Sequence, residues 1–102
     1  MDTIFALSSG QPPAAIGVFR ISGPQAAETL RNLAGAIPAP RRASFRTLRD
    51  ADGGVLDQAL VLWFPGPNTA TGEDLAELHL HGGRAVVAGV EKALTAFSGL
   101  RR

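Results

Sequence analysis

The 102-residue sequence contains no cysteine. This absence excludes disulfide scaffolds, thiolate zinc sites, iron–sulfur clusters and cysteine nucleophiles. Charge of either sign is not in excess, because ten lysine and arginine residues face nine aspartate and glutamate residues. A net charge of +1 excludes a strongly basic module that binds nucleic acid by charge alone. The sequence also lacks the GxxxxGK[ST] phosphate-binding loop and any discernible Ser/His/Asp nucleophile set.

Long hydrophobic runs are missing as well. The uncharged stretch 3–19 is interrupted by serine, glycine and proline at 8–13, so no run approaches the roughly 20 apolar residues of a membrane-spanning helix. Met1 is followed by an acidic residue, unlike the basic start of a secretory signal. We therefore expect the native N-terminus, no membrane segment and a cytoplasmic protein.

The composition that remains is that of one small globular domain. Hydrophobic residues make up 45% of the chain and charged residues 19%, a balance typical of a folded protein rather than a disordered one. A chain of this length has room for a single core. Because the sequence shows no internal repeat and no domain linker, we predict one domain over residues 1–102.

Hydrophobic patterning predicts the order strand, strand, helix, strand, strand, strand, helix. This order fits an α+β layered domain with a mixed sheet of about five strands and two main helices. Pro24 is expected at the first position of the first helix and Gly35 just after its end. Residues 98–102 are expected to form a tail. The predicted strands are 3–7, 15–22, 44–48, 55–64 and 75–81, and the predicted helices are 24–34 and 84–97.

Three of these segments can be placed further. The strand 15–22 is apolar on both faces, which favours a central position in the sheet. The strand 44–48 is less apolar and is expected nearer an edge. The segment 65–74, which precedes the last predicted strand, is a ten-residue loop without a regular pattern. Loops of that length in compact domains are often functional, although Gly72 and Asp74 are also typical of a simple turn.

Arg20 is a charged residue within the apolar strand 15–22. A buried charge without a partner costs several kcal/mol, so Arg20 must find one. One reading is a structural ion pair, or an arginine that reaches solvent from a strand end. The other is a clamp for an anion or a carboxylate, to which the planar guanidinium is suited.

Glu77, His79 and His81 alternate along the strand 75–81, so they share one face. Three readings stay open. The residues form a solvated strand face, or a metal site, since two imidazoles and a carboxylate are legitimate ligands. In the third reading, Glu77 accepts two parallel hydrogen bonds from the paired N–H groups of a heterocycle.

Four segments together resemble the N-terminal domain of the tRNA modification GTPases, the MnmE/TrmE family. Any one of these motifs is weak, but the ordered set is specific and covers nearly the whole chain. The segments are DTI at 2–4, GVFRISGP at 17–24, LWFPGPN with TGED at 62–68 and 71–74, and EL with HGG at 77–78 and 81–83.

The resemblance implies a fold similar to the tetrahydrofolate-binding domain of the glycine-cleavage T proteins. It implies a domain that forms a homodimer and binds a 5-formyl-tetrahydrofolate-type one-carbon donor. Full-length members of the family act with an FAD-containing partner on the wobble uridine of tRNA, and they use GTP, potassium and magnesium. Those sites belong to helical and GTPase domains absent here. We therefore expect a truncated chain that hydrolyses no GTP and modifies no tRNA alone.

Two folate-contacting positions are implied by motif. Arg20 precedes Ile-Ser-Gly, and Glu77 precedes leucine in the strand after TGED; neither is expected to be catalytic. A further folate-contacting lysine of the family lies beyond Arg102. The loop 9–15 lacks the glycine- and arginine-rich stretch of many members, and Leu80 stands where some have a small residue. The alternatives are a structural or dimerisation module without a ligand, and the metal site on the strand 75–81.

Overall fold

The computed structural model describes residues 3–7, 16–81, 83–97 and 100–101. The first seven elements confirm the predicted order and the α+β class. Among the described helices, none is long and apolar enough to cross a membrane. The elements are β1 (Thr3–Leu7), β2 (Ile16–Ser22), α1 (Ala26–Ala34), β3 (Ser44–Arg49), β4 (Val55–Phe64), β5 (Leu75–His81), α2 (Arg84–Ala96) and β6 (Leu100–Arg101).

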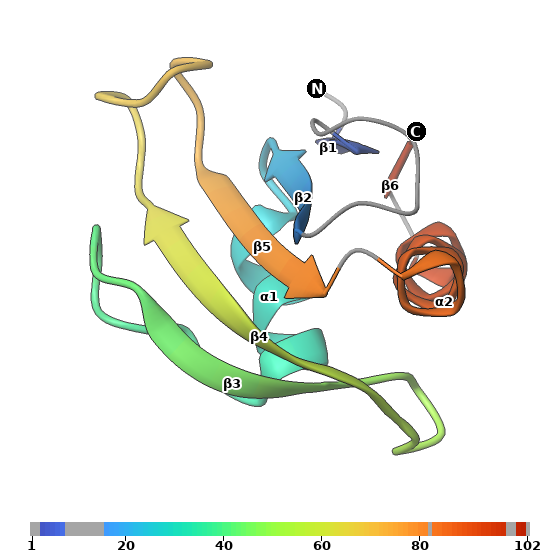
Figure 1. Ribbon diagram of the computed structural model, residues 1–102. Helices are drawn as coiled ribbons and strands as arrows, with labels where there is room; N and C mark the ends of the chain where they lie inside the picture. The colour runs from blue at the N-terminus through green and yellow to red at the C-terminus, as the bar shows by residue number, and fades with distance from the viewer. Residues whose placement is uncertain (1–2, 8–15, 82, 98–99, 102) are drawn as a thin grey trace.

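All of the strands belong to one sheet, in the order β3-β4-β5-β2-β1-β6 (Figure 1). The first five pair with their neighbours in antiparallel fashion, and the two-residue β6 pairs parallel to β1. The sheet is therefore mixed, as predicted. The central position of β2 and the edge position of β3 are also confirmed.

Two boundaries differ from the sequence-based expectation. Residues 100–101 were expected in a tail but form β6, which pairs with Thr3 and Ile4 of β1. Two residues are too few to show a periodic pattern, so the sequence alone does not indicate this pairing. The helix α1 begins at Ala26 rather than at Pro24. Gln25 is the N-cap, with φ −93° and ψ 3°, and its N–H donates to Thr3 Oγ1 at 2.7 Å.

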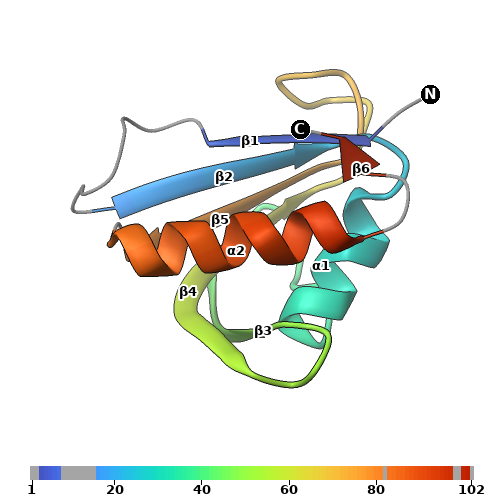
Figure 2. The ribbon, with the colours of Figure 1, turned by 90° about the vertical axis from the view of Figure 1, so that its right-hand side faces the viewer.

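The two helices cover one face of the sheet, as Figure 2 shows. Phe19, Ile21 and Leu78 point from the central strands into this layer and are fully buried. Leu30 of α1 and Leu94 of α2 close over them and are equally buried. Such burial of large apolar side chains is the dominant favourable term in folding. In the described part of the chain, the opposite face of the sheet carries no helix.

Candidate functional site

The uncovered face of the sheet carries a charged row across β2 and β5. Arg20 lies directly opposite Glu77 in the antiparallel register. The Arg20 Nε–H donates to Glu77 Oε2 at 2.9 Å, and His79 Nε2 lies 2.9 Å from Glu77 Oε1. The structure therefore brings the two predicted site residues together, and it places His79 with them.

Burial differs sharply within this row. The Glu77 side chain is only 14% exposed, whereas that of Arg20 is 52% exposed. Because solvent screens a half-exposed cation, the ion pair contributes about 1 kcal/mol or less to stability. The terminal guanidinium nitrogens of Arg20 have no partner among the described residues. Arg20 thus forms the ion pair that its strand position requires, and it still has donors to offer an anion.

His81 belongs to a separate pair at the far end of β5. Its Nδ1 lies 2.9 Å from Asp57 Oδ1, and its backbone N–H donates to Asp57 Oδ2 at 2.9 Å. The strand pattern indicated the face of His81 but not this partner from β4. Within the residues that the structure describes, no group of three or more histidine, cysteine or acidic side chains could hold a metal ion. The metal-site reading of β5 therefore gains no support from the geometry.

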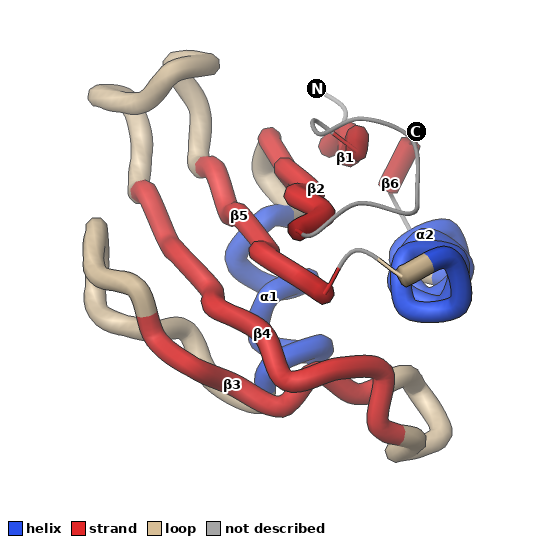
Figure 3. Tube along the Cα trace, viewed as in Figure 1, coloured by secondary structure: helices blue, strands red, loops and turns tan. Residues whose placement is uncertain are grey.

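The loop 65–74 joins β4 to β5 and stands at one end of the sheet (Figure 3). Its residues 68–70 line the same hollow as Glu77. The loop is tied to β2 because Ser22 Oγ donates to Thr71 Oγ1 at 2.8 Å. Asp74 joins the two ends of the loop, since its Oδ1 accepts the Gly66 N–H, eight residues earlier, at 2.8 Å. The loop is therefore an ordered wall beside the charged row.

Gly66 allows the two ends of this loop to approach closely. A Cβ atom at Gly66 would lie 2.9 Å from the backbone carbon of Glu73 and 3.2 Å from the nitrogen of Asp74. We expect Gly66→Ala to lower the free energy of unfolding by about 1–3 kcal/mol, because the backbone must move to relieve the overlap. Urea denaturation measures the loss.

A matched control for this change is Gly89→Ala in α2. There a Cβ atom meets only Leu56 Cδ2, at 3.5 Å, which is an ordinary contact. Because alanine is the better residue within a helix, Gly89→Ala is expected to raise stability by about 1 kcal/mol. A loss of stability for Gly66→Ala together with a gain for Gly89→Ala fits the steric argument, whereas an unchanged stability of Gly66→Ala contradicts it.

A hollow of about 260 Å³ lies between this loop and Glu77, the one residue of the charged row that lines it. Its walls are Arg41, Phe64, Leu75, Glu77 and the loop stretch 68–70. The Arg41 guanidinium carbon lies 5.8 Å from the centre of the Phe64 ring, and Arg41 Nη2 donates to the carbonyl of Asn68 at 2.6 Å. No pattern in the sequence marks Arg41, which follows a proline-rich connection. Only the folded chain shows that it faces the hollow lined by Glu77.

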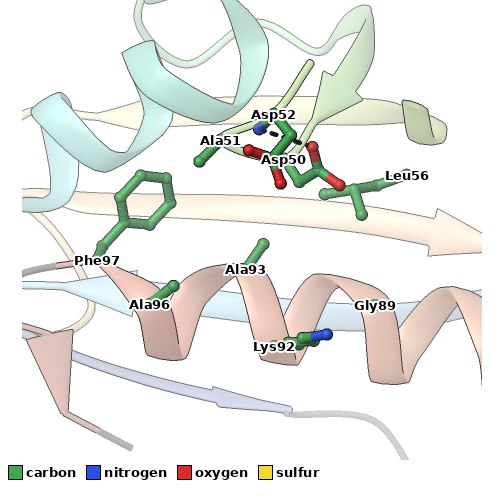
Figure 4. Close-up of a pocket in the computed structure, with 9 residues that line it drawn as sticks. All are labelled: Asp50, Ala51, Asp52, Leu56, Gly89, Lys92, Ala93, Ala96 and Phe97. Atoms are coloured by element: carbon green, nitrogen blue, oxygen red, sulfur yellow. Dashed lines mark hydrogen bonds between the residues drawn. The ribbon is translucent and has the colours of Figure 1, made fainter. Parts of the chain in front are cut away.

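A second hollow, of about 270 Å³, lies between the β3–β4 turn and α2 (Figure 4). Two acidic residues, Asp50 and Asp52, line it. The Asp50 carboxylate is already engaged, since its Oδ1 accepts the N–H groups of Asp52 and Gly54 at 3.0 and 2.8 Å. The α2 side contributes mainly apolar residues, among them Ala93 and Phe97. Neither predicted site residue lines this hollow, so the chemistry favours the one beside Glu77.

Residues 3–102 match the protein family described as GTP-binding protein TrmE N-terminus. The chain is 69% identical over 102 residues to the tRNA modification GTPase MnmE of Novosphingobium aromaticivorans, an alignment that covers 99% of this chain and 23% of that protein. It is 63% identical over 102 residues to the tRNA modification GTPase MnmE of Erythrobacter litoralis, covering 100% of this chain and 24% of that protein. The chain thus spans about a quarter of the length of these curated relatives.

Proposed function

Because the chain belongs to the family of the TrmE N-terminus, we propose that it is the folate-binding and homodimerising N-terminal domain of a tRNA modification GTPase. The site residues are Arg20 and Glu77, and the ligand is a 5-formyl-tetrahydrofolate-type one-carbon donor. The observation that carries this proposal is the Arg20–Glu77–His79 row, which stands on an uncovered sheet face beside a hollow lined by Glu77.

The chemistry of Glu77 supports a folate ligand. A pterin presents a ring N–H and an amino group side by side, and a carboxylate accepts such a pair through two parallel hydrogen bonds. Both oxygens of Glu77 already have one neighbour, but each carboxylate oxygen has two lone pairs. Arg20 and His79 hold the carboxylate in one orientation, so it is prepared for the incoming donors. The nearby guanidinium suits an anionic or carbonyl part of the ligand.

The same family membership supports a proposal for the activity of the whole protein. Its curated relatives are named tRNA modification GTPases and are about four times as long as the aligned region. We therefore propose that helical and GTPase domains outside residues 1–102 use GTP, potassium and magnesium. Together with an FAD-containing partner, that protein modifies the wobble uridine of tRNA. The domain itself is proposed to resemble the tetrahydrofolate-binding domain of the glycine-cleavage T proteins.

A second candidate function is a dimerisation module that binds no ligand. Exposed apolar side chains favour it: Ile4 is 50% exposed, Phe45 60% and Leu60 44%. Phe45 and Leu60 are direct neighbours in the β3–β4 register, on the face that the helices leave uncovered. Sedimentation at rising concentration tests self-association, and calorimetry with folate separates this module from a folate-binding one.

The folate proposal is tested by titrating 5-formyl-tetrahydrofolate into the chain by calorimetry. Arg20→Ala is expected to weaken binding at least about tenfold, because a hydrogen bond to a charged group contributes about 1.5–3 kcal/mol. The matched control is Arg31→Ala on α1, since the Arg31 side chain is also 52% exposed and also pairs with a glutamate, Glu28.

Either of two results contradicts the folate proposal. Equal binding by wild type and Arg20→Ala shows that the site assignment is wrong. If neither this chain nor a chain extended past Arg102 binds the ligand, the domain is not a folate-binding one, and the dimerisation module takes its place.

A further inference from the structure

The geometry points to Arg41 as an additional ligand-binding residue, one that binds the anionic tail of the folate while Glu77 binds its pterin ring. This inference rests on the proposed folate function and extends it to a residue that no sequence motif marks. It assigns the two ends of the ligand to two walls of one hollow. Glu77 and Arg41 both line that hollow, of about 260 Å³, between the uncovered sheet face and the loop 65–74.

The lining of the hollow fits a ligand with this distribution of charge. Folates consist of a hydrogen-bonding heterocycle, an aromatic aminobenzoyl group and a glutamate tail with carboxylates. The hollow offers a carboxylate at Glu77, an aromatic ring at Phe64 and a guanidinium at Arg41. An anionic tail at Glu77 meets a like charge, whereas the same tail at Arg41 meets an opposite one. The charges of the two walls therefore decide the direction in which the ligand lies.

The Arg41 side chain is held in place and still has hydrogen-bond donors to give. Its Nη2 donates to the carbonyl of Asn68 at 2.6 Å, and its guanidinium carbon lies 5.8 Å from the centre of the Phe64 ring. In the described part of the chain, Arg41 has no carboxylate partner. A guanidinium has five N–H donors, and it binds carboxylates through two parallel bonds. The remaining donors of Arg41 are thus available to an anion.

The backbone of Arg41 gives an independent reason to expect a function. Its φ angle is +61°, in the left-handed region that residues other than glycine rarely adopt. The Arg41 N–H donates to the carbonyl of Trp63 at 2.8 Å, which fixes the residue beside the end of β4. Backbone conformations of this kind cost free energy and gather at ligand sites, where the surrounding structure maintains them. Here the conformation coincides with a side chain that lines the hollow.

The test compares two ligands and two arginine variants. The ligands are 5-formyl-tetrahydrofolate and a 5-formyl-tetrahydropterin that lacks the aminobenzoylglutamate tail. Arg41→Gln removes the charge and keeps a side-chain donor for Asn68, while the control Arg42→Gln makes the same change of net charge at the adjacent exposed residue. We expect Arg41→Gln to weaken binding of the tailed ligand about tenfold or more and to leave binding of the tail-less pterin unchanged. Arg42→Gln is expected to leave both affinities unchanged.

The outcomes separate this inference from the folate function itself. Calorimetry measures the affinity for the tailed ligand, and protein NMR measures the weaker affinity for the tail-less pterin. Wild-type affinity of Arg41→Gln for the tailed ligand overturns the role of Arg41 and leaves the folate function standing. Equal losses for the two ligands, or equal affinities of the wild type for both, overturn the assignment of the tail. If neither the wild type nor a chain extended past Arg102 binds either ligand, the folate function fails and this inference fails with it.

A second variant guards against a merely structural effect. Arg41→Lys keeps the positive charge but loses the planar fork that binds a carboxylate through two bonds. For the tailed ligand, it is expected to bind more tightly than Arg41→Gln and more weakly than the wild type. Thermal unfolding confirms that each variant is folded. The same affinity for Arg41→Lys and Arg41→Gln contradicts a role for the charge.

Discussion

Replacing Phe19 with alanine is expected to lower the free energy of unfolding by about 3–5 kcal/mol. Phe19 is fully buried in the central strand β2, between Leu7 of β1 and Leu78 of β5. Its ring lies 6.3 Å from that of Phe5, at an interplanar angle of 52°. Truncation therefore removes apolar contacts and an aromatic pair, and it leaves a cavity where sheet and helices meet.

Urea denaturation measures this loss. It is a large share of the free energy of unfolding of a typical domain, which is roughly 5–15 kcal/mol. If Phe19→Ala does not fold, Phe19→Leu gives a smaller loss in the same direction. The control is Val55→Ala at the start of β4, where the side chain is 60% exposed, so its loss is expected to be about 1 kcal/mol or less. Losses of similar size at the two positions contradict the placement of the core.

The alternating pattern of 75–81 shows why much of the fold was predictable. In a strand that is buried on one face, apolar and polar residues alternate with a period of two. The structure shows this alternation in β5. The buried side chains are Ala76, Leu78 and Leu80, and those on the other face are Glu77, His79 and His81. A different pattern placed β2, which was predicted at the centre of the sheet because its segment is apolar on both faces, and the strand order confirms that position. These elements follow from local pattern because burial acts on each residue directly.

What local pattern did not predict depends on partners far away in the sequence. Arg20 and Glu77 are 57 residues apart, and only the β2–β5 register brings them together. The resemblance to a family named both residues, but the pairing of His81 with Asp57 was not predicted by either route. The pairing of β6 with β1 and the approach of Arg41 to the hollow were missed for the same reason. Register and loop packing are properties of the whole sheet and cannot be read from one segment.

The uncovered face also explains how one domain can serve two proposed roles. It carries the charged row of Arg20, Glu77 and His79 near the loop 65–74, and the apolar pair Phe45 and Leu60 toward the β3 edge. The two groups adjoin, because Leu60 lies opposite His79 in the β4–β5 register, but they consist of different side chains. Arg20→Ala and Glu77→Gln therefore test the ligand role without changing the apolar pair.

Glu77→Gln is expected to weaken binding of 5-formyl-tetrahydrofolate about 100-fold or more while it hardly changes the stability of the chain. The amide retains the shape of the side chain but loses the negative charge and one acceptor oxygen, so it no longer accepts two parallel bonds from a pterin. Each hydrogen bond to a charged group contributes about 1.5–3 kcal/mol, and two of them account for a change of this size.

The effect of Glu77→Gln on folding is expected to be small because its cation partner reaches water. Arg20 is 52% exposed, so solvent replaces much of the lost ion pair, at a cost of about 1 kcal/mol or less. Calorimetry and urea denaturation on the same sample measure both effects, with Glu28→Gln on α1 as the control that changes the same charge beside a 52% exposed arginine. A large loss of stability with unchanged affinity identifies Glu77 as a structural partner of Arg20. A large loss of affinity with nearly unchanged stability is the result that only a ligand-binding carboxylate produces.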